Sequence, residues 1–194
     1  MALTSTIYTF DIALNDVNRG VYEQLSLKVA CHPSETEEYL ATRVLAYCLE
    51  YTEGIAFSKG LSEPDEPAIS VRDLTGALRS WIEIGSPDAV RLHKASKAAP
   101  RLAVYTHKEP RLFLRTYEGA RIHRAEALEL YAVDRELLAE FVQRLDRRVK
   151  FSLTAGKLAD LVVLKADRRT VPAIEIVNVG IERTMAGGRW VYES

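Results

Sequence analysis

The sequence predicts an α/β fold in which helices flank a central mixed sheet. Residues 3–14 and 21–31 alternate polar and apolar side chains on either side of a turn cluster, which is typical of a β-hairpin. Residues 35–50 then carry apolar side chains at helical spacing. The order of elements over residues 35–106 is helix, three strands, helix, strand. We therefore expect one sheet with helices packed on it.

Each predicted helix has a recognisable start. Ser34 begins the capping-box pattern S-x-x-E before the helix at 35–50. Ser86 is expected to cap a second helix that runs to about residue 98, with Pro87 at its first position. Asp134 is expected to cap a third helix over about 135–147.

The predicted strands beyond the hairpin are short apolar runs. They cover 55–61, 68–72, 77–84, 101–106, 112–115, 149–154, 160–165, 173–180 and 190–192. We expect residues 1–152 to form one domain and residues 153–194 to form a β-rich extension packed on it.

Composition restricts the class of protein. Of the 194 residues, 47% are hydrophobic and 27% charged, as in ordinary globular proteins. Two cysteines do not make a disulfide framework, which favours a reducing compartment. No apolar run approaches the roughly 20 residues of a membrane helix, and the polar–apolar alternation of the first residues is unlike a signal peptide. We expect a cytoplasmic protein that does not enter a membrane.

The net charge of −1 argues against a generally basic nucleic-acid binder, but the charges are unevenly spread. Residues 34–88 contain eleven acids and four bases, whereas residues 91–124 contain nine bases and two acids. This division suits a metal site beside a phosphate-binding surface. Helix caps and solvated faces explain it equally well.

Several acids lie where they can serve as metal ligands. Asp65 and Glu66 occupy a loop between two strands, and Glu83 lies near the end of an apolar strand. Mg²⁺ prefers oxygen ligands and keeps several waters, so two or three carboxylates suffice. The alternative for Glu83 is a polar strand face turned to solvent.

An ordered set of short matches covers about residues 1–152. It comprises MALTSTIY at 1–8, HPSET at 32–36 followed by Arg43, KGLS at 59–62, DEP at 65–67, WIE at 81–83, PD at 87–88 and KA at 94–95. In this order and spacing, the set resembles the YaeQ family of small bacterial proteins.

That family is regarded as a variant of the PD-(D/E)XK nuclease fold, which has an α-β-β-β-α-β core. The resemblance implies that Asp65 or Glu66 is the first acid and Glu83 the second, with Glu35 as a third ligand for Mg²⁺ or Mn²⁺. The motif expects a lysine two residues after the second acid, where this chain has Gly85. Lys94 or Lys59 would then supply the amine from elsewhere.

Two functional hypotheses follow from this resemblance. The first is a metal-dependent phosphodiesterase or nuclease, in which basic residues contact the phosphates of nucleic acid. Those residues are Arg91, Lys94, Lys97 and Arg101. The second is a catalytically inactive module that binds nucleic acid or a protein partner, and Gly85 favours it. The sequence indicates no oligomeric state.

The C-terminal residues carry a different resemblance. The strings GKLADLVVL at 156–164 and AGGRWVY at 186–192 resemble the C-terminal β segment of amidohydrolases. The chain has no barrel-length region, and its four histidines are scattered, so no dinuclear hydrolase centre is expected. This resemblance therefore predicts strands, and a small hydrolase of that type is the least favoured hypothesis.

Overall fold

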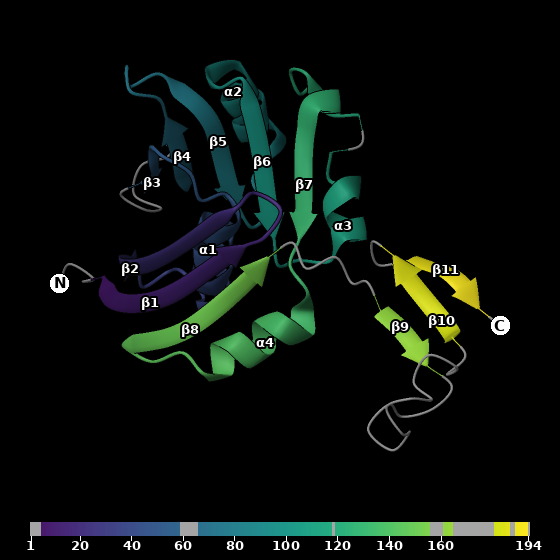
Figure 1. Ribbon diagram of the computed structural model, residues 1–194. Helices are drawn as coiled ribbons and strands as arrows, with labels where there is room; N and C mark the ends of the chain where they lie inside the picture. The colour runs from purple at the N-terminus through teal and green to yellow at the C-terminus, as the bar shows by residue number, and fades with distance from the viewer. Residues whose placement is uncertain are drawn as a thin grey trace. The chain divides into compact units, whose positions relative to one another are not determined.

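The computed structural model describes residues 5–58, 66–117, 119–155, 161–164, 181–186 and 189–193. The chain divides into two compact units, Met1–Leu14 with Glu23–Leu153 and Asn15–Tyr22 with Thr154–Ser194. The second unit contains an antiparallel sheet with the strand order β11-β10-β9, drawn in green and yellow in Figure 1. Its strands are β9 (Leu161–Leu164), β10 (Ile181–Ala186) and β11 (Arg189–Glu193).

A five-stranded mixed sheet forms the centre of the first unit. Its order is β3 (Ile55–Phe57), β4 (Ile69–Arg72), β5 (Leu78–Ile84), β6 (Arg101–Thr106) and β7 (Leu128–Ala132). The pairings β3–β4 and β4–β5 are antiparallel, whereas β5–β6 and β6–β7 are parallel. The predicted mixed sheet is confirmed, as is the order helix, three strands, helix, strand over residues 35–106. Strand β7 was not predicted.

The two faces of this sheet pack on different helices because side chains alternate along each strand. Helix α1 (Glu37–Leu49) places Ala46 and Tyr47 in a cluster with Ile82, Ile84 and Ala103. Helix α2 (Ala89–Ala98) packs on the other face through a second cluster, which includes Leu92, Ala95, Trp81, Leu102 and Val104. Position 83 alternates with Ile82 and Ile84, so Glu83 belongs to the α2 face.

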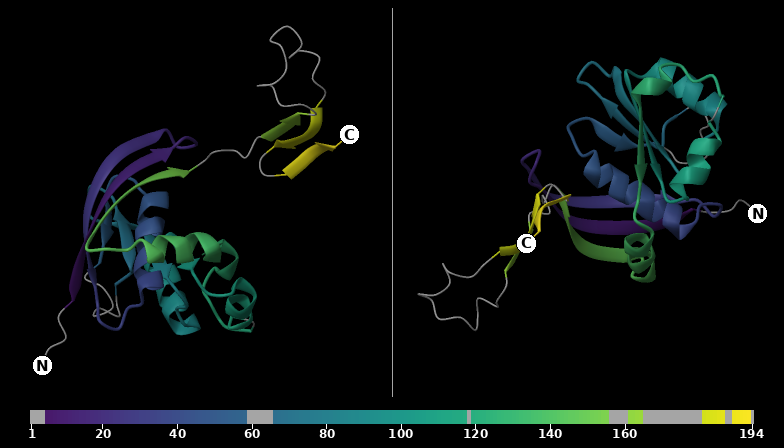
Figure 2. Two further views of the ribbon diagram at one scale, coloured as in Figure 1. Left: turned by 90° about the horizontal axis from the view of Figure 1, so that it is seen from below. Right: turned by 90° about the vertical axis from the view of Figure 1, so that its right-hand side faces the viewer.

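A second sheet in the first unit has the order β2 (Val21–Cys31), β1 (Thr6–Asp16) and β8 (Arg148–Ala155). The first two strands are the predicted hairpin. Helix α1 lies between the two sheets of this unit (Figures 1 and 2). Helix α4 (Arg135–Gln143) packs Leu138 against Ala41 and Leu45 of α1.

Two predicted helix starts were wrong by two residues. Helix α1 begins at Glu37, and Thr36 caps it by accepting a hydrogen bond from the backbone N of Tyr39 at 3.2 Å. Ser34 does not cap the helix, because its hydroxyl lies 2.6 Å from Nδ1 of His32 in the preceding turn. Helix α2 is likewise capped by Asp88, whose Oδ1 accepts from the backbone N of Arg91 at 2.7 Å, and not by Ser86.

Other boundaries also differ from the predictions. The expected strand at 112–115 is part of helix α3 (Pro110–Arg115), which begins with a proline, a residue well suited to the first helical position. Asp134 caps α4 as predicted, but that helix ends at Gln143. A 3-10 turn spans Ala125–Ala127. The predicted strand at 173–180 lies outside the described residues. No helix in the described ranges is long and apolar enough to cross a membrane.

Candidate functional site

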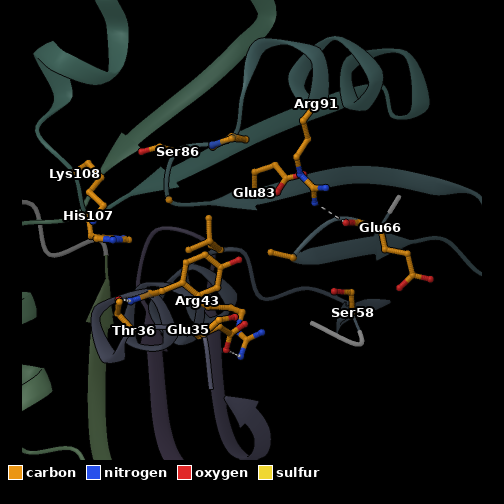
Figure 3. Close-up of a pocket in the computed structure, with 16 residues that line it drawn as sticks. Glu35, Thr36, Arg43, Ser58, Glu66, Glu83, Ser86, Arg91, His107 and Lys108 are labelled. Atoms are coloured by element: carbon orange, nitrogen blue, oxygen red, sulfur yellow. Dashed lines mark hydrogen bonds and ion pairs between the residues drawn. The ribbon is translucent and has the colours of Figure 1, made fainter. Parts of the chain in front are cut away.

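A pocket of about 440 Å³ opens at the carboxyl ends of β5 and β6 (Figure 3). Ligands of open α/β sheets commonly bind outside the carboxyl ends of the strands. The start of α1, the segment before β4, the loop into α2 and the residues after β6 all contribute to the wall. Its polar and charged lining residues are Ser34, Glu35, Thr36, Tyr39, Arg43, Ser58, Glu66, Glu83, Ser86, Arg91, His107 and Lys108.

Glu83 is buried in this wall, and its Oε1 is paired with two neighbouring donors. The residue is 3% exposed, and its Oε1 accepts hydrogen bonds from Nε1 of Trp81 at 2.5 Å and from Nε of Arg91 at 2.7 Å. Burial raises the pKa of the Glu83 carboxyl, while the contacts with Trp81 and Arg91 act in the opposite direction. The predicted alternative of a solvent-facing glutamate is therefore wrong.

Arg91, on α2, connects this helix with β5 and with the segment before β4. Besides Glu83, its Nη2 donates to the backbone carbonyl of Glu66 at 2.8 Å. The antiparallel pairing of Ile69 with Ile82 brings the segment before β4 to the end of β5 that carries Glu83. The carboxylate of Glu66 is nevertheless exposed and points away from Glu83 in Figure 3. Asp65 and Lys59, the other predicted residues of this region, lie outside the described residues.

Glu35 and Arg43 form a second buried ion pair on the α1 side. Their side chains are 1% and 3% exposed, and Nη2 of Arg43 donates to Oε2 of Glu35 at 3.1 Å and to the carbonyl of Ala30 at 2.6 Å. Within the described residues, Oε1 of Glu35 and Nε of Arg43 are buried without a hydrogen-bond partner. Glu35 is thus neutralised by an arginine, as Glu83 is.

Gly85 has a backbone conformation that side chains rarely adopt. Its φ is +84°, and a Cβ there would lie 3.6 Å from the ring of Tyr39 and 3.8 Å from Cε1 of His107. Burial, followed by the charge of Lys108, lowers the pKa of His107. Burial also raises the pKa of Tyr39 to about 12. The motif lysine is therefore absent from a position whose backbone favours glycine, and an imidazole stands beside that position.

The four predicted phosphate contacts separate in space. Arg91 lines the pocket, whereas Lys94 and Lys97 are exposed on α2 and do not. Arg101 begins β6, at the opposite end of that strand from the pocket. Its guanidinium is held by the carboxylates of Glu50 and Glu129.

Carboxylate oxygens have the right chemistry for a hard cation such as Mg²⁺. In the part of the chain that the structure describes, however, no three residues among histidine, cysteine, aspartate and glutamate are grouped closely enough to hold a metal ion. A cation at Glu83 would need a further ligand, such as Asp65, and a displaced Arg91.

Sequence reasoning missed several residues of the pocket, notably Tyr39, Arg43, His107 and Lys108. The sequence does contain a signal for His107 and Lys108, because these residues directly follow the apolar run that forms β6. Since β6 is parallel to β5, residues after both strands meet at one edge of the sheet. Arg43 interrupts a buried apolar stretch of α1, which also suggests a paired charge.

Comparison with known proteins determines the family. The family model described as "YaeQ protein" matches residues 1–173. The chain belongs to the YaeQ family. It is 37% identical to YaeQ of Escherichia coli (strain K12) over 107 residues, which are 55% of this chain and 59% of that protein. Identity to YaeQ of Salmonella typhi is 36% over a region of the same length. The match thus spans about three-fifths of the length of these relatives.

Two YaeQ crystal structures are also similar to this chain. The YaeQ protein from Pseudomonas syringae aligns with a TM-score of 0.70 and 29% identity, covering 98% of this chain and 97% of that one. The YaeQ protein from Xanthomonas axonopodis pv. citri aligns with a TM-score of 0.71 and 28% identity, covering 86% and 93%. The YaeQ similarity therefore extends beyond residue 152, where the sequence matches were expected to end. The amidohydrolase-like tail stays a prediction.

Proposed function

We propose that this chain is a metal-dependent phosphodiesterase of the PD-(D/E)XK type that acts on nucleic acid in the pocket. The antiparallel register of β4 and β5 supports the proposal, because it brings the segment that follows Asp65 to the same end of the sheet as Glu83. This nuclease layout requires two acids at one end of the sheet, and the segment before β4 would contribute the second one.

Each residue has a role in this proposal. Glu83, with Asp65 or Glu66, would hold Mg²⁺ or Mn²⁺, and the ion would supply charge stabilisation at the phosphate. Arg91 would bind a phosphate oxygen through its guanidinium, which pairs well with phosphate geometry. The exposed Lys108 would add positive charge at the rim.

His107 would take the role of the missing lysine. Its ring lies beside Gly85, and its lowered pKa keeps the imidazole neutral near pH 7. A neutral imidazole accepts a proton from an attacking water, as general-base catalysis requires.

The test is cleavage of labelled single- and double-stranded DNA and RNA with Mg²⁺ or Mn²⁺. We expect Glu83→Gln to abolish cleavage, a loss of at least about 100-fold for a residue of this kind. Glu136→Gln, a change at an exposed glutamate of α4, is the matched control and should keep full activity. Equal cleavage by both variants, or intact substrate at high protein concentration, would contradict the proposal.

The second candidate is a binding module without turnover, and two observations favour it. The lysine position is a glycine with positive φ, and Glu83 already has a cationic partner in Arg91. This candidate predicts that labelled oligonucleotides bind without being cut, as measured by fluorescence anisotropy. Arg91→Gln should weaken that binding, while Arg79→Gln, which alters an exposed ion pair away from the pocket lining, should not.

A further inference from the structure

We infer that the open edge of β8 binds an extended peptide segment of a partner protein, in which apolar and acidic residues alternate. The binding surface is this edge together with a groove of about 420 Å³ between β8 and α4, here called the β8 groove. Its lining includes Leu137, Phe141 and Arg144 from α4 and its end, and Arg148, Lys150 and Phe151 from β8. None of the described residues that line the β8 groove also lines the pocket at the end of β5.

The hydrogen bonds of β8 show which of its residues face the open edge. β8 is an outer strand of its sheet, whose order in the described residues is β2-β1-β8 (Figure 1). On the β1 side, the carbonyl of Arg147 accepts from the backbone N of Thr9 at 2.9 Å, and that of Ala155 accepts from the backbone N of Val17 at 3.1 Å. The odd-numbered residues of β8 therefore bond to β1. Backbone groups of successive residues point to opposite sides of a strand, so the even-numbered residues direct theirs to the open edge.

These even-numbered residues include Arg148, Lys150 and Ser152, whose side chains are exposed. The odd-numbered side chains lie on the other face, because side chains alternate along a strand. Phe151 is one of them, and its ring meets that of Phe141 on α4 with the centroids 5.0 Å apart. A peptide strand added to β8 alternates in the same way. One set of its side chains enters the groove, and the other set lies beside the exposed side chains of β8.

The α4 wall of the groove is apolar where the first set of peptide side chains lies. Leu137 and Phe141 are four residues apart on α4 and therefore share one face of the helix. Leu137 is 56% exposed, although it is a large apolar residue. Apolar residues at alternate positions of the peptide cover this face together with Phe151.

The charges around the groove favour acidic residues in the second set. Among the described residues that line it, Arg144, Arg148 and Lys150 stand against a single acid, Glu140. Glu140 pairs with Arg144 at 2.5 Å. Arg148 lies 3.9 Å from Asp11 in an exposed contact, which solvent weakens. Positive charge thus remains beside the open edge, where the carboxylates of the peptide meet it.

The same charges disfavour a second copy of this chain as the occupant. Two β8 strands paired edge to edge would bring Arg148 and Lys150 of one copy close to those of the other, and like charges across a strand pair are destabilising. Lysine on an edge strand is a common protection against such self-association. An acidic peptide reverses the sign of this contact, so the edge that rejects its own copy admits this partner.

The experiment measures binding of the fluorescein-labelled peptide Glu-Val-Glu-Ile-Glu-Val-Glu to the full chain by fluorescence anisotropy. We expect saturable binding by the wild type. Lys150→Glu should weaken it about tenfold through repulsion of the glutamates, and Leu137→Ser about fivefold through loss of apolar contact. The matched controls are Lys28→Glu, at an exposed lysine of β2, and Leu74→Ser, at a leucine that is 91% exposed outside the groove. Both controls should change the affinity less than about twofold.

N-methylated peptides test the backbone pairing separately from the side chains. Methyl groups on the amides of the glutamates, or on those of the apolar residues, remove alternate donors of the peptide. Only one of these two sets faces β8, so one methylated peptide should lose binding and the other should keep it.

Three outcomes would overturn the inference. The first is no binding of the parent peptide, or binding that Lys150→Glu and Leu137→Ser leave unchanged. The second is equal behaviour of the two N-methylated peptides, which would exclude strand addition. The third is a wild-type dimer in sedimentation that Leu137→Ser dissociates, because a second copy would then occupy the edge.

Discussion

At the scale of single residues, the positive φ of Gly85 limits which residue types can follow the end of β5. We predict that Gly85→Lys, which restores the motif residue, lowers the free energy of unfolding by about 1–2 kcal/mol, because an L side chain at φ +84° is strained. Gly76→Lys is the control, since Gly76 has φ +82° and open space around it. Urea unfolding measures both variants, and they should lose similar amounts. An unchanged Gly85→Lys would mean that the backbone relaxes freely there.

The pKa of His107 predicts how the stability of the protein changes with pH. Its folded-state pKa lies below the usual value of 6.5, with burial as the first cause and Lys108 as the second, while Glu38 opposes them. The folded state therefore binds the proton less readily than the unfolded state does. Its contribution to stability is complete above about pH 6.5 and is lost as the pH falls towards the folded-state pKa. We predict a shallower decline in melting temperature between pH 7 and pH 5 for His107→Gln than for wild type. Parallel curves would show that another group causes the decline.

The residue scale also shows where sequence reasoning stops. The strand carrying Glu83 and the glycine in place of lysine could both be seen in the sequence. The partner of Glu83 could not, because Arg91 follows eight residues later and meets it only after α2 packs on the sheet. A buried carboxylate signals that a partner exists, but only tertiary packing identifies it.

At the scale of secondary-structure elements, the start of α1 positions Glu35 and Arg43 at the pocket. We predict that Thr36→Ala lowers the free energy of unfolding by about 1 kcal/mol, because the backbone N of Tyr39 loses its capping acceptor. Ser34→Ala is the matched comparison, and its cost should be smaller, since Ser34 is exposed and bonds to a half-buried histidine two residues before it. Chemical unfolding of the two variants decides between Thr36 and Ser34 as the cap.

The same helix explains why its predicted start was wrong. The S-x-x-E pattern is present, but Oε2 of Glu35 accepts from the backbone N of His32 at 3.1 Å, so residues 32–35 form a separate turn. Thr36 is then the first residue before the helix whose hydroxyl oxygen can accept a hydrogen bond from the first turn. The helical spacing of apolar residues predicted that a helix exists here. Its first residue was decided locally, by whether Ser34 or Thr36 caps it.

At the scale of the first unit as a whole, Arg101 connects elements that are remote in sequence. Its guanidinium pairs with Glu50 at the end of α1 and with Glu129 on β7, which lie 51 and 28 residues away. Tyr105 adds a hydrogen bond to Oε1 of Glu50 at 2.7 Å. The basic segment containing Arg101 suggested a phosphate-binding surface, but charge counts along a sequence cannot tell a surface arginine from one that joins a helix to a sheet.

This network predicts unequal effects for its two acids. The side chain of Glu50 is 11% exposed, so Glu50→Gln leaves a half-buried guanidinium with one carboxylate fewer and should cost about 1–3 kcal/mol. The side chain of Glu129 is 38% exposed, and solvent screening should keep the cost of Glu129→Gln below about 1 kcal/mol. Urea unfolding at pH 7 measures both costs.

The pH dependence of Glu129 separates its ionic contribution from packing. The hydrogen bond with Arg101 is the first cause that holds the pKa of Glu129 below its ordinary value of 4.5. The folded state therefore releases this proton more readily than the unfolded state, and the stabilisation is present above about pH 4.5 and lost as the pH falls through the folded-state pKa. We expect the difference in unfolding free energy between wild type and Glu129→Gln to shrink when the pH is lowered from 7 to 3. A difference that stays constant would assign the contribution of Glu129 to shape and not to charge, and Arg101 would then be held chiefly by Glu50.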